Sequence, residues 1–102
     1  MKACCTTYLN EQFGGDAAVM GEIYREYVDS IREKQQEAVK DRAAGEWSLL
    51  DRVAHTIKGN ALATGDNEMA QVAISLRSAA QLQDREQAAT LITRIQMLSE
   101  QL

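Results

Sequence analysis

The sequence has 102 residues, a length that fits one domain and leaves little for a second. Apolar residues make up 45% and charged residues 25%, which is ordinary for a folded globular domain and excludes a disordered chain. The formal net charge of −4, without any basic run, argues against a nucleic-acid partner. No apolar run reaches transmembrane length, and the N-terminus lacks the pattern of a signal peptide.

The only cysteines are Cys4 and Cys5, which are adjacent in the chain. Adjacent cysteines cannot cross-link distant segments, and the pair does not match the spacing of zinc ligands. We therefore expect reduced thiols, a cytoplasmic protein and no metal site.

The chain contains no proline and is rich in good helix formers, so its composition predicts an all-α fold. The first expected helix, residues 6–13, carries Tyr8, Leu9 and Phe13 and ends at two glycines. We expect this short helix to lie as a lid on the end of a bundle. The predicted organisation is one domain over residues 1–102, with the lid in residues 1–15 and a four-helix bundle in residues 16–102.

Asp16 is suited to cap a second helix, expected over residues 17–43 and ended by Gly45. Its apolar residues recur at spacings of three, four and seven and form one stripe: Met20, Ile23, Tyr24, Tyr27, Ile31 and Ala38. Residues 34–37 are more polar, so the far half of this helix is a candidate to project past the core.

The third helix is expected over residues 47–64, with Gly65 just past its end. Its apolar face comprises Trp47, Leu50, Val53, Ala54, Ile57 and Ala61. Either Asp66 or Asn67 is expected to cap the fourth helix, residues 68–82, in which Met69, Val72, Ala73, Leu76 and Ala80 form the stripe.

Asp84 with Gln87 resembles a capping box for the last helix, expected over residues 85–101. The connections between the expected helices are short, so neighbouring helices should run antiparallel. The predicted fold is an antiparallel up-down four-helix bundle with a short extra N-terminal helix. A filled bundle of this kind needs no second copy to complete its core, so we expect a monomer.

His55 is the only histidine and falls inside the third expected helix. At about 100° per residue, the apolar residues of that helix lie roughly 160–260° around the axis from His55. The imidazole is therefore predicted to face away from the core. The residues expected beside it on the same face are Asp51, Arg52, Lys58, Gly59 and Leu62.

Three of these neighbours favour chemistry at the imidazole. Gly59 costs about 1 kcal/mol relative to alanine in a helix interior, and it leaves space beside the ring. Lys58 places an ammonium where it could bind an anion attached to the ring, and Leu62 offers apolar contact. A neutral imidazole is a competent nucleophile toward phosphorus. From helical geometry alone, an exposed histidine with ordinary surface neighbours stays open as the alternative, because surface histidines and lysines are common.

The segment from Ala54 to Ala61, AHTIKGNA, resembles the core motif of histidine phosphotransfer (HPt) domains. The resemblance extends from about residue 16 to the C-terminus and includes Trp47, Gly65 and the run Met69, Ala73 and Leu76. It implies that His55 is phosphorylated, that Lys58 stabilises the phosphate and that Gly59 provides steric clearance.

Two positions depart from the family pattern. Asn60 stands where many members have serine or alanine, and it should be tolerated at the helix surface. Arg77 stands where members often carry glutamine or glutamate. An arginine there could add a second cation beside the phosphate or could be a solvated surface residue, and the sequence leaves both interpretations open.

The resemblance further implies a phosphorelay intermediate rather than a self-sufficient enzyme, with no nucleotide site, metal or cofactor of its own. Its partners would be receiver domains of response regulators and of a hybrid sensor histidine kinase, which bring the aspartate and Mg²⁺. The candidate partner-binding residues are Ser48, Arg52, Asn60, Leu62 and Arg77.

Two alternative functions stay open at this point. One is a non-catalytic helical adaptor that binds receiver domains, although the presence of both His55 and Lys58 argues against it. The other is the phosphoacceptor region of a chemotaxis-type kinase, which would need catalytic domains in the same polypeptide. We expect a free-standing protein instead.

Overall fold

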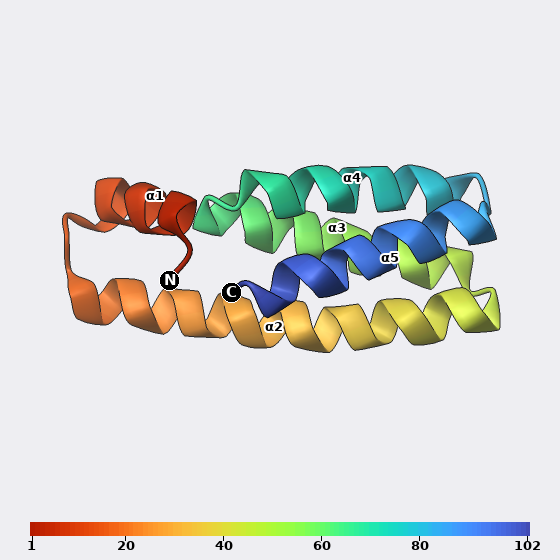
Figure 1. The fold of residues 1–102 in the computed structure, drawn as a ribbon, viewed down its shortest axis with the longest axis horizontal. Coiled ribbons are helices and arrows are strands. Elements are labelled where there is room, and N and C mark those ends of the chain that lie inside the picture. The colour runs from red at the N-terminus through yellow and green to blue at the C-terminus, as the bar shows by residue number, and fades with distance from the viewer.

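The protein consists of five helices without a strand in a computed structural model that describes residues 1–102 (Figure 1). The helices are α1 (Ala3–Phe13), α2 (Ala17–Ala44), α3 (Trp47–Thr64), α4 (Asn67–Gln81) and α5 (Arg85–Glu100). They form an elongated body of 43 × 20 × 18 Å, and the all-helical prediction is confirmed. None of the helices combines the length and apolar character that a membrane crossing requires.

Successive helices reverse direction along the long axis of the molecule (Figure 1). The longest, α2, runs the full length, while α3, α4 and α5 pack together beside its C-terminal part and α1 lies beside its N-terminal part. The prediction that the far half of α2 projects past the core is wrong. Ala38 in that half is buried, and the Ser99 hydroxyl of α5 donates to Gln35 Oε1 at 2.8 Å.

The predicted bounds of α3 match the structure, and the bounds of α2, α4 and α5 differ by one residue at most at each end. Helix α1, however, begins at Ala3 instead of residue 6. The backbone N–H groups of Cys5 and Thr6 both donate to the carbonyl of Lys2, and Lys2 Nζ lies 2.9 Å from Asp66 Oδ1. The early start thus depends on a partner 64 residues away in the sequence.

Aspartate side chains cap three of the helices. Asp16 accepts from the backbone N–H of Val19, and Asp84 accepts from that of Gln87. Asp66, and not Asn67, caps α4 by accepting from Met69 N at 3.3 Å. These caps satisfy backbone donors that have no partner inside their own helix, and they fix where each helix begins.

A single cluster of buried residues forms the core, and it draws on all five helices, including Cys5 and Leu9 of α1. The most extensive contact is between α3 and α4. Both helices present small side chains there: Ala54 and Ala61 from α3, and Ala70, Ala73, Ala79 and Ala80 from α4, all buried. Small residues let two helices approach closely, so side chains at the edges of this contact can meet across it.

Candidate functional site

His55 lies in the middle of α3 and is exposed to solvent. Leu50, Ala54 and Ile57 of the same helix are fully buried, which places the imidazole on the outer face, as the helical spacing predicts. The 3.6-residue period of the helix separates an apolar face, which packs inward against α2 and α4, from the polar outer face that carries His55.

The space beside the imidazole is open at Gly59, one turn further along α3. A Cβ atom built on Gly59 would have no heavy atom within 4 Å. Gly59 keeps a helical backbone and is itself exposed, so no tight packing or special backbone angle accounts for a glycine here. Because Gly59 has no side chain, another molecule can approach the imidazole from this side.

Lys58, three residues after His55, is half-buried, and its ammonium belongs to none of the ion pairs in the structure. Residues three apart on a helix are neighbours on its surface. The histidine therefore has beside it a cation that no carboxylate of the protein neutralises.

A second cation contacts the ring directly. Arg77 of α4 places Nη1 3.1 Å from His55 Nδ1, and its Nε donates to Asp51 Oδ1 at 2.9 Å. The same carboxylate oxygen accepts from Gln81 Nε2 at 3.4 Å. Arg77 is thus held by two residues of α3 and is not a freely solvated side chain.

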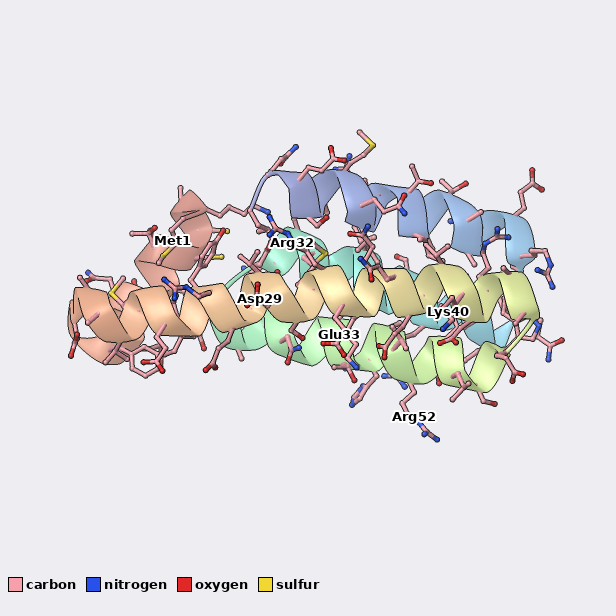
Figure 2. The ribbon with its side chains drawn as sticks, turned by 90° about the horizontal axis from the view of Figure 1, so that it is seen from below. Met1, Asp29, Arg32, Glu33, Lys40 and Arg52 are labelled. Carbon is pink, nitrogen blue, oxygen red and sulfur yellow. The ribbon has the colours of Figure 1, made fainter.

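Other predicted site residues surround the histidine at greater distance. Ser48 and Arg52 are exposed on α3, and Arg52 extends away from the bundle (Figure 2). Leu62 retains 47% of its accessible surface, Leu49 of α3 retains 42% and Ile74 of α4 retains 40%, so three large apolar side chains remain uncovered on these helices. These features match what a docking surface needs, which is a polar rim with apolar contacts inside it.

Asn60 is the predicted residue that the structure does not bring to the histidine. Its side-chain amide donates to Ser30 Oγ of α2 at 2.7 Å, so it faces the contact between α2 and α3. At five residues from His55, Asn60 lies about 140° around the helix. Asn60 therefore does not share the face of the imidazole, and its part in partner binding stays a prediction.

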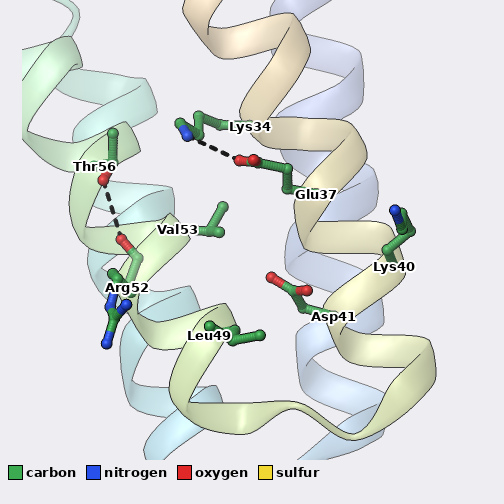
Figure 3. Close-up of a pocket in the computed structure, with 8 residues that line it drawn as sticks. All are labelled: Lys34, Glu37, Lys40, Asp41, Leu49, Arg52, Val53 and Thr56. Atoms are coloured by element: carbon green, nitrogen blue, oxygen red, sulfur yellow. Dashed lines mark hydrogen bonds and ion pairs between the residues drawn. The ribbon is translucent and has the colours of Figure 1, made fainter.

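A groove between α2 and α3 opens on the Arg52 side of the site (Figure 3). Val53 and Leu49 contribute apolar surface, and Asp41 and the paired Lys34 and Glu37 contribute charges of both signs. Partial burial, together with Glu37 and Glu46, raises the pKa of Asp41 above its ordinary value. The mixed charges give this groove no strong preference for an anion or a cation.

Asp51, Gln81 and Ile74 are neighbours of the site that the sequence interpretation did not include among its functional residues. Asp51 is four residues before His55 and shares its face, so helical spacing identified it as a neighbour. Its role in holding Arg77 could not be found this way, because Arg77 belongs to another helix.

The comparisons with known proteins bear on the chain as a whole. A family model described as Hpt domain matches residues 22–102, a span that contains His55, Lys58, Gly59 and Arg77. No curated protein and no solved structure matches the chain.

In the structure, no group of three or more histidine, cysteine, aspartate or glutamate side chains is placed to hold a metal ion.

Proposed function

This chain belongs to the Hpt domain family, and from that premise we propose that it is a histidine phosphotransfer protein of a multistep two-component phosphorelay. His55 accepts a phosphoryl group from an aspartate of one receiver domain and passes it reversibly to another. The observation that carries this proposal is an exposed imidazole with open space at Gly59 and an unpaired ammonium at Lys58.

The transfer needs little from the protein beyond a positioned nucleophile. An imidazole lone pair attacks phosphorus, the N–P bond forms, and the O–P bond to the aspartyl carboxylate breaks as that carboxylate leaves with its electron pair. Arg77 contacts Nδ1 of His55, so Nε2 is the ring nitrogen without a protein partner, and it can attack once it has given up any proton it carries. The phosphoryl group brings about two negative charges, which Lys58 offsets in part.

The proposed division of labour gives the aspartate and the metal ion to the partner. The receiver domain supplies the aspartate and Mg²⁺, and this chain acts as a phosphoryl carrier without a nucleotide site, metal or cofactor of its own. We place docking on the face around His55, with Ser48, Arg52, Leu62 and Arg77 at its edges. The interface is transient and buries about 1,200 Å² in total, the small end of specific complexes.

We further propose a monomer in which α2–α5 form an up-down bundle and α1 is an added helix. The upstream donor is the receiver domain of a hybrid sensor histidine kinase. Both cysteines are free thiols in the structure, which supports a reducing, cytoplasmic setting.

The deciding experiment is a phosphotransfer screen against receiver domains, with His55→Gln beside the wild type. We expect label that is labile in acid and stable in base, and we expect His55→Gln to abolish it. Because the ring is exposed, this variant should keep its helical circular dichroism and a free energy of unfolding within about 0.5 kcal/mol of the wild type.

The exposed Glu100→Gln on α5 serves as a matched control that should label like the wild type. Label retained in His55→Gln would contradict the site. Binding of receiver domains without any label on the wild type would identify a non-catalytic adaptor instead.

A further inference from the structure

The hydrogen bond between Arg77 and His55 constrains where the proton of the ring can be. A guanidinium group has only donors and stays charged at any ordinary pH, so it cannot accept a hydrogen bond from the ring. The 3.1 Å contact between Arg77 Nη1 and His55 Nδ1 therefore needs a lone pair on Nδ1. In a neutral imidazole the single proton is then on Nε2.

Asp51 holds the Arg77 guanidinium beside Nδ1 of the ring. Its carboxylate accepts from Arg77 Nε at 2.9 Å, and it stands on the same face of α3 as the imidazole, four residues earlier. About 30% of each side chain of this pair remains exposed, so the pair is only partly screened by water. The close packing of α3 and α4 brings the arginine to both acceptors at once.

We propose that Arg77, oriented by Asp51, is a positioning residue that holds His55 of the free protein in the Nε2-protonated tautomer. Attack on phosphorus needs a lone pair at Nε2, the nitrogen without a protein partner. The arginine thus withholds the reactive tautomer until it releases Nδ1. This consequence for transfer rests on the proposed phosphotransfer function, whereas the tautomer itself does not.

The proton balance of the step is simple. Before attack, Nε2 gives its proton to water and Nδ1 takes one up, which is possible only after Arg77 leaves Nδ1. The Nε2–P bond then forms as the aspartyl O–P bond breaks and the carboxylate leaves with its electron pair. The incoming phosphoryl group is an anion, so it competes with Nδ1 for the guanidinium and favours this release.

The test reads the tautomer directly, from two-bond ¹H–¹⁵N spectra of ¹⁵N-histidine-labelled protein at a pH where the ring is neutral. We expect the wild type to show an unprotonated Nδ1. Arg77→Met removes the donor and should raise the Nδ1-protonated share about fivefold, the change that loss of one hydrogen bond produces. Asp51→Ala should change it in the same direction but by less.

Lys58→Met is the matched control, since it removes a cation from the same helix face without touching Nδ1, and its tautomer should equal that of the wild type. A wild-type ring protonated on Nδ1, or an unchanged tautomer in Arg77→Met, would overturn the proposal. An equal tautomer shift in Lys58→Met would also overturn it, because the cause would then be charge and not the hydrogen bond.

The effect on reactivity is measured with phosphoramidate, a small donor that needs no docking. Arg77→Met should label faster than the wild type, by up to about fivefold. Equal or slower labelling would overturn the restraint on transfer. If neither protein is labelled by phosphoramidate or by any receiver domain, the proposed function fails while the tautomer result stands.

Discussion

Two cations near His55 have different surroundings in the structure. Arg77 is held between Asp51 and the imidazole, whereas Lys58 has no acidic partner. A cation that already pairs with a carboxylate, as Arg77 does with Asp51, would have to break that pair to bind phosphate. Lys58 needs no such exchange, so it is the residue that we expect to meet the phosphoryl group first.

Replacing Lys58 with alanine tests this expectation at the scale of one residue. Without the ammonium, a phosphoryl group on His55 loses one charge-assisted hydrogen bond, so transfer from a receiver domain should slow about tenfold. The free energy of unfolding should change by less than about 0.5 kcal/mol, because Lys58 makes no ion pair. Rates come from single-turnover labelling, and stability comes from urea unfolding.

Lys58→Arg is the matched control for this variant, since it keeps the positive charge. We expect it to recover most of the lost rate. A transfer rate in Lys58→Ala equal to that of the wild type would show that this ammonium does not act on the phosphate.

At the scale of the element, α3 contains Gly59, which lowers the stability of the helix although its backbone conformation does not require a glycine. Gly59→Leu should raise the free energy of unfolding by up to about 1 kcal/mol, because leucine is a far better helix former and the space is empty. Transfer from a receiver domain should nevertheless fall, by about 100-fold if the partner is displaced by an ångström.

Gly59→Ala is the control for helix propensity, because it gains similar stability with only a methyl group. Phosphoramidate, which needs no docking, should still label both variants. Transfer from the receiver at the wild-type rate in Gly59→Leu would remove the argument that this glycine provides access.

The glycine that ends α3 has a different reason to be glycine. Gly65 has φ +82°, a left-handed conformation, and a Cβ placed on it would overlap the Tyr8 side chain of α1. Gly65→Ala should therefore lower the free energy of unfolding by more than about 1–2 kcal/mol, the cost of the left-handed backbone alone. Urea unfolding of the intact chain measures this difference.

Gly14→Ala provides the matched comparison, because Gly14 has φ +61° but no heavy atom within 4 Å of its Cβ position. The free energy of unfolding of Gly14→Ala should fall only by the cost of the left-handed backbone. Equal losses in the two variants would mean that the contact between α1 and the end of α3 adds nothing to stability.

At the scale of the whole molecule, one buried carboxylate joins α1, α2 and α4. Asp66 is fully buried, and it accepts from Lys2 Nζ at 2.9 Å and from the Tyr27 hydroxyl at 2.7 Å. Nearby, Tyr24 accepts from the Lys2 backbone N–H and donates to the carbonyl of Leu102, which ties both chain ends to α2 (Figure 1). The junction between α1 and the rest of the bundle is therefore stabilised by polar contacts among distant parts of the chain.

The deprotonation of buried groups near Asp66 is expected to lower the stability of the protein at alkaline pH. Burial, then the neighbouring Cys4, raises the pKa of Cys5 from 9.0 to about 12. Burial and the bond to Asp66 likewise raise the pKa of Tyr27 above its ordinary value. For both groups the folded state holds the proton more tightly than the unfolded state, so the free energy of unfolding falls as pH rises through 9 to 11.

The slope from Cys5 alone should approach about 1.4 kcal/mol per pH unit above pH 9. Urea unfolding at a series of pH values measures it. Cys5→Ala should flatten the fall between pH 9 and 10, whereas Cys4→Ala, which removes an exposed thiol, should largely keep it. A free energy of unfolding of the wild type that does not change from pH 8 to 11 would contradict this account.

The family match begins at residue 22, so α1 and the first turns of α2 lie outside it. Helix α1 is also the element whose predicted bounds differed most from the structure. The start of α1 at Ala3 depends on the contact of Lys2 with Asp66. No local pattern near residues 1–5 contains that information.

By itself, the sequence determined what repeats at short range. The apolar period and Gly65 defined the bounds of α3, and the period gave the outward direction of His55, because both depend only on residues of this segment. Only the tertiary structure decided that Arg77, held by Asp51, contacts the ring, and that Asn60 bonds to Ser30 of α2. Those contacts join different helices, and their geometry is set by how closely α2, α3 and α4 pack, which no spacing within one helix encodes.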